Sequence, residues 1–444
     1  MKSTIILLFL HVILMSFNSA CYSADGGVNE TDSFFTEIPG FQLDFSQSVH
    51  TQNIDVVRLR HVAVNVPILA QRMGRHGVGQ VNFNLFKDTV FPVAINKIDR
   101  ISAGSTTIWS GKIAGLKLSR VSIAITDNIV AGTLRTGDGR FFQIGYVGNG
   151  VHVVKEIDEA KRPVEGRPLQ PPVGQGTLIE PSPPSGSASD SGDIITVMVV
   201  YTTSAKNKAN GKAAMESIIN SSVATMNTTF ANSGIIPRMR LVHTVEVAYN
   251  RGENDAIAGF HTALNDLTHK TDGYMDNIHA LRDKYHADMV QLLFDNDSLG
   301  GLAWKMTRVS NLFESYAFSV VHYGFADGWA FDHELGHNMG MTHDRANSSS
   351  PGSYSYSYGY QNPSKDWHTV MAYTCLGWCP RIDYWSNPDV SYSGAATGVS
   401  VGLVNEADAR TTINNNAYTI ANWRVSNAAA RNGGLKFLPL LLLK

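Results

Sequence analysis

The chain has 444 residues, 43% of them hydrophobic, and its formal net charge is −2 at pH 7. This length allows two or three domains with cores of their own. The near-neutral charge gives no electrostatic basis for binding nucleic acid. The sequence contains no run of 18 or more apolar residues, so no ordinary membrane-spanning helix is expected.

Residues 1–24 have the layout of a secretory signal peptide. A basic residue precedes an apolar run over residues 5–17, and small residues follow. The pattern predicts export to the periplasm or the extracellular space, with cleavage after Ala20 or Ala24. A buried N-terminal helix and a lipid anchor at Cys21 are the alternatives.

Residues 25–161 are rich in β-forming side chains, in short runs separated by Gly, Asn and Asp turns. This pattern is typical of an antiparallel meander. The expected strands cover residues 106–111, 121–125, 129–134, 141–146 and 151–154. No catalytic constellation appears in this region.

Residues 162–192 form a predicted linker. Prolines crowd this stretch and a Ser-Gly-Ser-Ala-Ser run follows them. Such a composition cannot bury a core, so the linker is expected to be extended, exposed and open to proteolysis. Cleavage is expected near Arg162, near Arg167 or at the Ser-rich end.

From residue 193 the pattern changes to alternating strands and helices, which predicts a mainly parallel sheet covered by helices. The expected strands cover residues 194–201, 240–247, 288–294, 300–304 and 318–322, the expected helices 213–231, 273–285 and 407–423. The strand that contains Leu302, Ala303 and Trp304 is expected at the edge of the sheet. An exposed edge strand can bind an extended peptide as one more strand.

The strongest signal is H-E-x-x-H-x-x-G-x-x-H-D at residues 333–344. On a helix, His333 and His337 project from the same face, and two imidazoles so placed suit zinc. Gly340 lets the chain turn out of the helix, which could bring His343 round as a third ligand. Three protein ligands leave a fourth position for water, which is typical of a catalytic zinc site.

Glu334 adjoins the first histidine and is placed to act as a general base toward a water molecule at the metal. The whole motif resembles the zinc-binding signature of the metzincin metallopeptidases. That family also has a methionine-containing turn beneath the zinc, and Met371 in Val-Met-Ala-Tyr stands where this turn is expected. The resemblance implies a twisted, mostly parallel five-stranded sheet above a small lower subdomain.

Within this family the chain looks closest to bacterial peptidyl-Asp metallopeptidases and has adamalysin/reprolysin-like features. The resemblance rests on the motif, on Met-Ala-Tyr and on Arg-Ile-Asp-Tyr-Trp-Ser-Asn-Pro at residues 381–388, and it covers residues 193–425. It implies a preference for aspartate after the scissile bond, with Arg381 meeting the carboxylate. A solvent-facing arginine is the alternative. Tyr373 stands where some metzincins place a tyrosine that stabilises the oxyanion, or it packs only.

Cys375 and Cys379 remain once Cys21 is removed or lipidated, and they are expected to pair in an oxidising compartment. Asp295-Asn296-Asp297 could bind calcium, although a solvated turn explains these residues as well. Residues 426–444 are expected to form a disordered tail.

The position of residues 25–161 ahead of a peptidase domain predicts a propeptide that silences it, with an ordinary β accessory domain as the alternative. Residues 25–192 contain no cysteine, which excludes a thiolate switch. Asp138 could cap the metal instead, but a Gly-Asp-Gly hairpin turn explains the same residues without any metal and is the favoured interpretation. The sequence thus predicts a secreted zinc endopeptidase made as a zymogen, acting on protein or peptide substrates. The alternative is a non-catalytic binding or adhesion protein on the same scaffold, which would have no need of Glu334.

Overall fold

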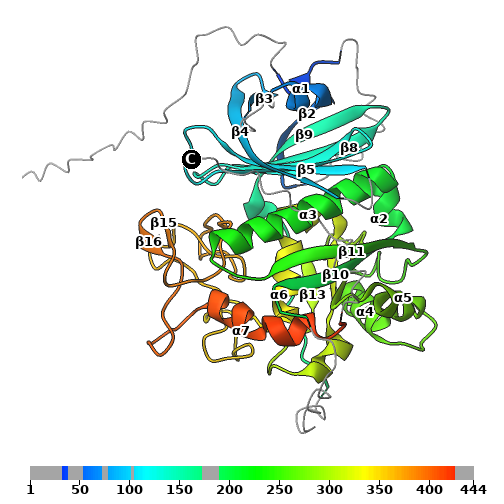
Figure 1. Cartoon of the computed structure of the whole chain (residues 1–444), viewed down its shortest axis with the longest axis vertical. Coiled ribbons are helices and arrows are strands. Elements are labelled where there is room, and N and C mark those ends of the chain that lie inside the picture. The colour runs from blue at the N-terminus through cyan, green and yellow to red at the C-terminus, as the bar shows by residue number, and fades with distance from the viewer. Residues whose placement is uncertain (1–32, 39–53, 73–78, 102–104, 173–189, 426–444) are drawn as a thin grey trace, which may run out of the picture.

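The computed structural model describes residues 33–38, 54–72, 79–101, 105–172 and 190–425. The predicted signal peptide, Cys21, most of the predicted linker and the predicted C-terminal tail lie outside these ranges. The described chain forms two regions, one on either side of the gap at 173–189, and they pack against each other (Figure 1).

The N-terminal region is built around an antiparallel sheet. Its strand order over the described residues is β1-β2-β9-β8-β7-β6-β5-β4-β3. The strands are β1 (Phe35–Thr36), β2 (Val56–Val64), β3 (Gln80–Phe86), β4 (Thr89–Arg100), β5 (Thr106–Ile113), β6 (Arg120–Thr126), β7 (Ile129–Arg135), β8 (Phe141–Gly148) and β9 (Val151–Ile157), with α1 (Val66–Arg72) after β2. The five strands expected from the sequence are all present as β5 to β9, and neighbours from β3 to β9 pair as a meander.

The C-terminal region contains a second sheet, with the order β11-β10-β12-β14-β13 in the described chain. Its strands are β10 (Ile194–Thr202), β11 (Arg238–Val247), β12 (Met289–Phe294), β13 (Gly301–Ala303) and β14 (Phe318–His322). All pairings are parallel except that of β13 with β14. The expectation of a mainly parallel sheet with an edge strand near residue 302 is therefore confirmed.

Helices cover this second sheet. They are α2 (Thr203–Lys208), α3 (Lys212–Asn232), α4 (Ala256–Thr268), α5 (Asn277–Tyr285), α6 (Phe331–Asn338) and α7 (Ala409–Ala421). The sequence did not predict α4, and α5 begins four residues later than predicted because Gly273 and Met275 have positive φ angles of 89° and 55°. None of the helices in the described ranges has the length and apolar character needed to cross a membrane.

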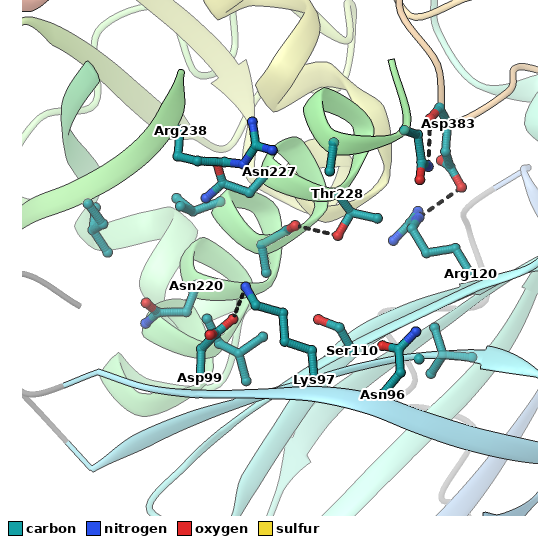
Figure 2. A pocket seen from close by; sticks show the side chains of 18 of the residues that line it. Asn96, Lys97, Asp99, Ser110, Arg120, Asn220, Asn227, Thr228, Arg238 and Asp383 are labelled. Carbon is teal, nitrogen blue, oxygen red and sulfur yellow. Dashed lines mark hydrogen bonds and ion pairs between the residues drawn. The ribbon is translucent and has the colours of Figure 1, made fainter. Parts of the chain in front are cut away.

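The long helix α3 lies between the two sheets and joins the regions (Figure 1). On one side of it, residues of the helix, β4 and β5 line a cavity of about 800 Å³ (Figure 2). At the end of this cavity Arg120 Nε lies 2.9 Å from Asp383 Oδ2, an ion pair between the regions. Arg135 Nε lies 3.6 Å from the other oxygen of the same carboxylate. The two regions are thus joined by buried charges as well as by apolar packing.

Candidate active site

The zinc-type motif lies on α6, which is completely buried and follows a π-helical turn over Ala326–Ala330. The amide of Asn338, at the end of α6, donates hydrogen bonds to the carbonyl oxygens of Trp304 (2.8 Å) and Phe318 (3.1 Å), which fixes the helix to the sheet. Gly340 then has a φ of 96°, and a Cβ there would overlap Ser353 Oγ. The predicted role of this glycine as the exit from the helix is confirmed.

The three motif histidines meet at their Nε2 atoms. The Nε2 atom of His343 lies 3.1 Å from those of both His333 and His337. Their ligand atoms form the only group of three or more His, Cys, Asp or Glu side chains in the described ranges that could hold a metal ion. Tetrahedral zinc bonded at about 2.0–2.1 Å would place two such nitrogens about 3.4 Å apart, so the spacing fits this ion.

The protonation of these rings also fits a metal. The Nδ1 atoms of His333 and His337 lie 2.8 Å from the carbonyl oxygen of Val370 and 3.0 Å from that of Met341. A carbonyl oxygen only accepts, so each Nδ1 carries the proton and each Nε2 keeps its lone pair. Burial, followed by the neighbouring histidines, lowers the pKa of His333 well below its ordinary value, and burial lowers the pKa of His337 to about 3.

The carboxylate of Glu334 lies close to the three histidines. Both of its oxygens are buried and have no hydrogen-bond partner among the described residues. A Cβ at Gly301 of β13 would lie only 2.8 Å from Oε1, so the edge strand and the carboxylate are in close contact. Burial, and then the nearby Glu165, raises the pKa of Glu334 well above its ordinary value.

Met371 lies beneath the helix, as the predicted turn requires. It is 1% exposed, and a Cβ at Gly336 would overlap its Sδ atom. A side chain larger than hydrogen at position 336 would therefore displace either the helix or the methionine. Gly336, which lies between His333 and His337, is therefore packed closely against the turn that carries Met371.

Tyr373 lies beside the third histidine of the motif. Its ring centroid lies 4.1 Å from that of His343, and its hydroxyl donates a 2.8 Å hydrogen bond to the carbonyl oxygen of Glu165. Burial, and then Glu165 and Glu334, raises the pKa of Tyr373, so the phenol remains a donor. The tyrosine therefore contacts the histidine group, and its role toward an oxyanion stays a prediction.

The start of the predicted linker is only partly exposed. The expectation of an exposed linker was wrong for Glu165 and Gly166, which are buried, whereas Val164 and Arg167 are exposed. Gly166 N donates to Gly301 O (2.8 Å), Leu169 N to Ala303 O (2.9 Å), and Lys305 N to Leu169 O (2.7 Å). The segment therefore runs along β13 in the parallel direction, with an isolated β-bridge between Leu169 and Trp304. The composition argument failed because these hydrogen bonds use the backbone, which the open edge of a sheet satisfies whatever the side chains are.

The edge strand presents its backbone to this segment. The side chains of Leu302 and Trp304, which the sequence assigned to substrate binding, are 1% and 7% exposed and face the core. Trp304 Nε1 donates to Thr268 Oγ1 at 2.9 Å. The main-chain groups that face this segment belong to Gly301, Ala303 and Lys305. Of the residues assigned to substrate binding only Ala303 contributes to them, because Trp304 N and O bond instead to Phe318 O and the Asn338 amide.

Arg381 is 8% exposed, so the solvent-facing alternative was wrong. Its Nη1 atom lies 3.3 Å from Glu165 Oε1, and this oxygen is also 3.3 Å from Nδ1 of His333. Its Nη2 atom donates to the carbonyl oxygen of Trp329 (3.1 Å) and lies 3.8 Å from Asp332 Oδ1. Arg381 therefore lies beside the first histidine and is paired there with the buried carboxylate of Glu165.

Sequence reasoning missed Glu165, Trp329 and Asp332. Asp332 directly precedes the motif, and this position could have drawn notice. Glu165 carried no signal, because it is brought to Arg381 across 216 residues of chain. Burial raises the pKa of Glu165 to about 7, against the opposing effect of Arg381.

Several other predicted sites have simpler explanations or remain predictions. Cys375 and Cys379 form a disulfide. Asp138 accepts a hydrogen bond from Thr136 in the turn between β7 and β8, as the hairpin interpretation expects. The Asn296 amide donates to the carbonyl oxygens of Gly252 and Ala256 and so braces a loop. Calcium binding at 295–297 gains no support from this arrangement.

Comparison with known proteins bears on the same region. Residues 191–386 match the model of metallo-peptidase family M12. The chain is 33% identical over 313 residues to a peptidyl-Asp metalloendopeptidase of Stenotrophomonas maltophilia, covering 68% of this chain and 70% of that one. It is 31% identical over 350 residues to a protein of the same name from Xanthomonas campestris pv. campestris, covering 74% and 78%. Among solved structures, metalloproteinase-II from Bacteroides fragilis matches 62% of this chain and 84% of its own, with 10% identity and a TM-score of 0.39.

Proposed function

We propose, given that this chain belongs to the peptidyl-Asp metalloendopeptidase family, that it is a zinc endopeptidase with His333, His337 and His343 as metal ligands. That it is a metalloendopeptidase follows from the family itself. The observation that carries the rest is the convergence of three Nε2 atoms, two of them with their lone pairs free, beside a buried carboxylate with no partner among the described residues. Zinc, when bound there, would lower the pKa of water to about 7 and polarise a peptide carbonyl.

Glu334 is the general base in this proposal. Its carboxylate takes a proton from the attacking water molecule and delivers it to the nitrogen of the leaving amine. The raised pKa of this group suits both steps, because a carboxyl group with a pKa nearer neutrality accepts and returns a proton readily. The Tyr373 phenol donates a hydrogen bond to the oxyanion that forms on the carbonyl carbon.

The open edge of β13 binds the substrate backbone. Gly301 O, Ala303 O and Lys305 N are the main-chain groups that pair with residues 164–169 in the full chain. A substrate strand would use the same donors and acceptors once that segment has left. In this proposal, the scissile bond of a substrate paired with β13 lies between Glu334 and Tyr373.

Arg381 supports a preference for aspartate after the scissile bond. It is a buried cation beside His333, and it already contacts one carboxylate, that of Glu165. Charge-assisted hydrogen bonds of this kind are about twice as strong as neutral ones. The relatives named peptidyl-Asp metalloendopeptidase are consistent with this choice.

The N-terminal region acts as an inhibitory propeptide in this proposal, and the chain is exported. The support is that residues 164–169 occupy the edge strand and the Arg381 pocket together. A peptide cannot enter until this segment is cut and displaced. The runner-up, a binding protein without turnover, gives no reason for a buried carboxylate without a partner, which destabilises a fold unless it is used.

The direct test is cleavage-site profiling on a peptide library, using the full chain before and after limited proteolysis within residues 170–192. We expect cleavage only after processing, inhibition by a zinc chelator, and aspartate enriched after the cut bond. Processed protein that binds zinc but cuts no peptide would favour the binding protein instead.

A further inference from the structure

The guanidinium group of Arg381 has two edges with partners from different parts of the chain. The Nη2 edge contacts Trp329 O and Asp332 Oδ1, at 3.1 and 3.8 Å. The Nη1 edge contacts Glu165 Oε1 at 3.3 Å. The first pair belongs to the catalytic region, whereas Glu165 belongs to the segment that must leave.

The Nη2 edge is held by two residues at and just before the start of α6. Trp329 and Asp332 are three residues apart, so they face the same side of the helical turn. The indole ring of Trp329 also lies under the guanidinium, with its centroid 5.5 Å from Cζ. Asp332 is 4% exposed, and it is held in turn by the hydroxyl of Thr229 on α3 at 3.5 Å.

The Nη1 edge becomes free when residues 164–169 leave. Glu165 is its only charged partner among the described residues. An arginine edge that has lost its carboxylate in a buried pocket retains unsatisfied donors, which favours the binding of another carboxylate.

Arg381 has a competing partner nearby. Asp383 is two residues further along and pairs with Arg120 and Arg135 of the N-terminal region. Removal of that region frees the Asp383 carboxylate. A long, flexible arginine side chain could then turn toward Asp383 unless something holds it in the pocket.

We infer that Asp332 is the positioning residue for acid selection: it holds the Nη2 edge of Arg381, so that the Nη1 edge stays directed at the side chain after the scissile bond. This inference rests on the proposed function. It adds a residue that does not touch substrate but decides how strongly an acidic side chain is preferred. The competing explanation is that Asp332 only ties α6 to α3 through Thr229.

The test compares two peptides that differ only in aspartate or asparagine after the scissile bond. For Asp332→Asn in the processed enzyme we expect the ratio of kcat/KM values, aspartate over asparagine, to fall at least about tenfold, because the arginine is no longer held. The loss should appear mainly as a higher KM for the aspartate peptide. Asp332→Glu should restore part of the ratio. Asp389→Asn, whose carboxylate is 72% exposed and paired with Arg410, is the matched control and should leave the ratio unchanged.

Equal losses for both peptides, with the ratio intact, would show a merely structural role and overturn the inference. A wild-type enzyme with no preference for aspartate would instead refute the proposed specificity on which the inference rests. A second measurement needs no turnover: hydrogen exchange at Gly166 and Leu169 in the uncut chain. We expect faster exchange in Asp332→Asn, because Glu165 loses a well-held partner, and no change in Asp389→Asn. Unchanged exchange in Asp332→Asn would count against the inference.

Discussion

The hydroxyl of Tyr373 donates a hydrogen bond of 2.8 Å to the backbone carbonyl oxygen of Glu165. The side-chain carboxylate of Glu165 lies against Arg381. One residue therefore contacts both the proposed oxyanion donor and the arginine proposed to select an acidic side chain. In the uncut chain Glu165 therefore holds both groups in place while it denies them to a substrate.

Replacing Glu334 by glutamine should separate metal binding from catalysis. We expect peptide hydrolysis by the processed enzyme to fall about 10²–10⁴-fold, because the amide cannot accept the proton. Zinc content, measured by atomic emission, should stay at the wild-type level. Glu246→Gln on the exposed face of β11 is the control, and full activity in Glu334→Gln would refute the proposed base.

Removal of the metal should abolish hydrolysis and lower thermal stability. A ligand that binds only the native state stabilises it by about 2.7 kcal/mol at a concentration of 100 Kd. We therefore expect a fall in Tm on chelation and recovery on adding zinc. His343→Ala should weaken zinc binding at least about tenfold in competition with a chromophoric chelator, whereas His261→Ala, outside the histidine group, should not. Equal zinc affinity in both variants would contradict the ligand assignment.

Tyr373→Phe tests the oxyanion donor. Loss of one such donor costs about 10²–10³ in kcat, with little change in KM, because the hydrogen bond strengthens only in the transition state. Steady-state kinetics on a fluorogenic peptide would measure this split. A rise in KM alone would indicate that the phenol binds substrate and does not stabilise the oxyanion.

Glu165→Gln should weaken the binding of residues 164–169 to the candidate active site in the uncut chain. Its carboxylate is buried against Arg381, and the neutral amide loses the charge-assisted part of that contact. We expect the uncut variant to show measurable hydrolysis, several-fold above the uncut wild type. Glu37→Gln, at an exposed carboxylate of the N-terminal sheet, should remain as silent as the wild type. An uncut Glu165→Gln chain that stays silent would show that the backbone hydrogen bonds to β13 suffice.

Asp383→Asn should weaken the packing of the N-terminal region against the C-terminal region. The substitution leaves Arg120 and Arg135, each 4% exposed in its side chain, facing a neutral amide. Breaking a buried pair in this way costs about 3–5 kcal/mol. Urea unfolding of the uncut chain would measure the loss, with Asp389→Asn as the exposed control. A change below about 1 kcal/mol would mean that the contact is not needed for docking.

The same pair has a pH signature. Burial alone would raise the pKa of Asp383, but Arg120 and Arg135 hold it below its ordinary value. A carboxyl group with a lowered folded-state pKa stabilises the fold above its unfolded pKa of about 3.9, and the stabilisation is lost as the pH falls through the folded value. The difference in unfolding free energy between wild type and Asp383→Asn should therefore be largest near pH 7 and shrink below about pH 4. A difference that is constant from pH 7 to pH 3 would contradict this.

The parts that the sequence predicted well depend on local pattern. β14 begins and ends at the predicted residues, because Phe-Ser-Val-Val-His is a short apolar run in a buried position. The position of Gly340 follows from a conformation that only glycine adopts readily. The four-residue spacing of His333 and His337 predicts that both side chains project from one face of a helix.

The parts that it did not predict depend on contacts between distant residues. Pairing along an edge strand placed residues 164–169 beside β13, although the proline-rich composition of residues 162–192 indicated an exposed linker. The acid pocket is formed by Glu165, Trp329, Asp332 and Arg381, which no local pattern links. Burial of Arg381 was likewise invisible, because an arginine in a polar run looks the same whether it faces water or a carboxylate.

The contact between Gly301 and Glu334 has a mechanical consequence. The strand that we propose aligns a peptide backbone lies directly against the carboxylate that we propose moves the proton, with no side chain between them. The depth at which a peptide seats on β13 therefore sets the distance from its scissile bond to that carboxylate. A peptide that seats badly is misaligned for proton transfer as well, so recognition and reaction rate rise and fall together.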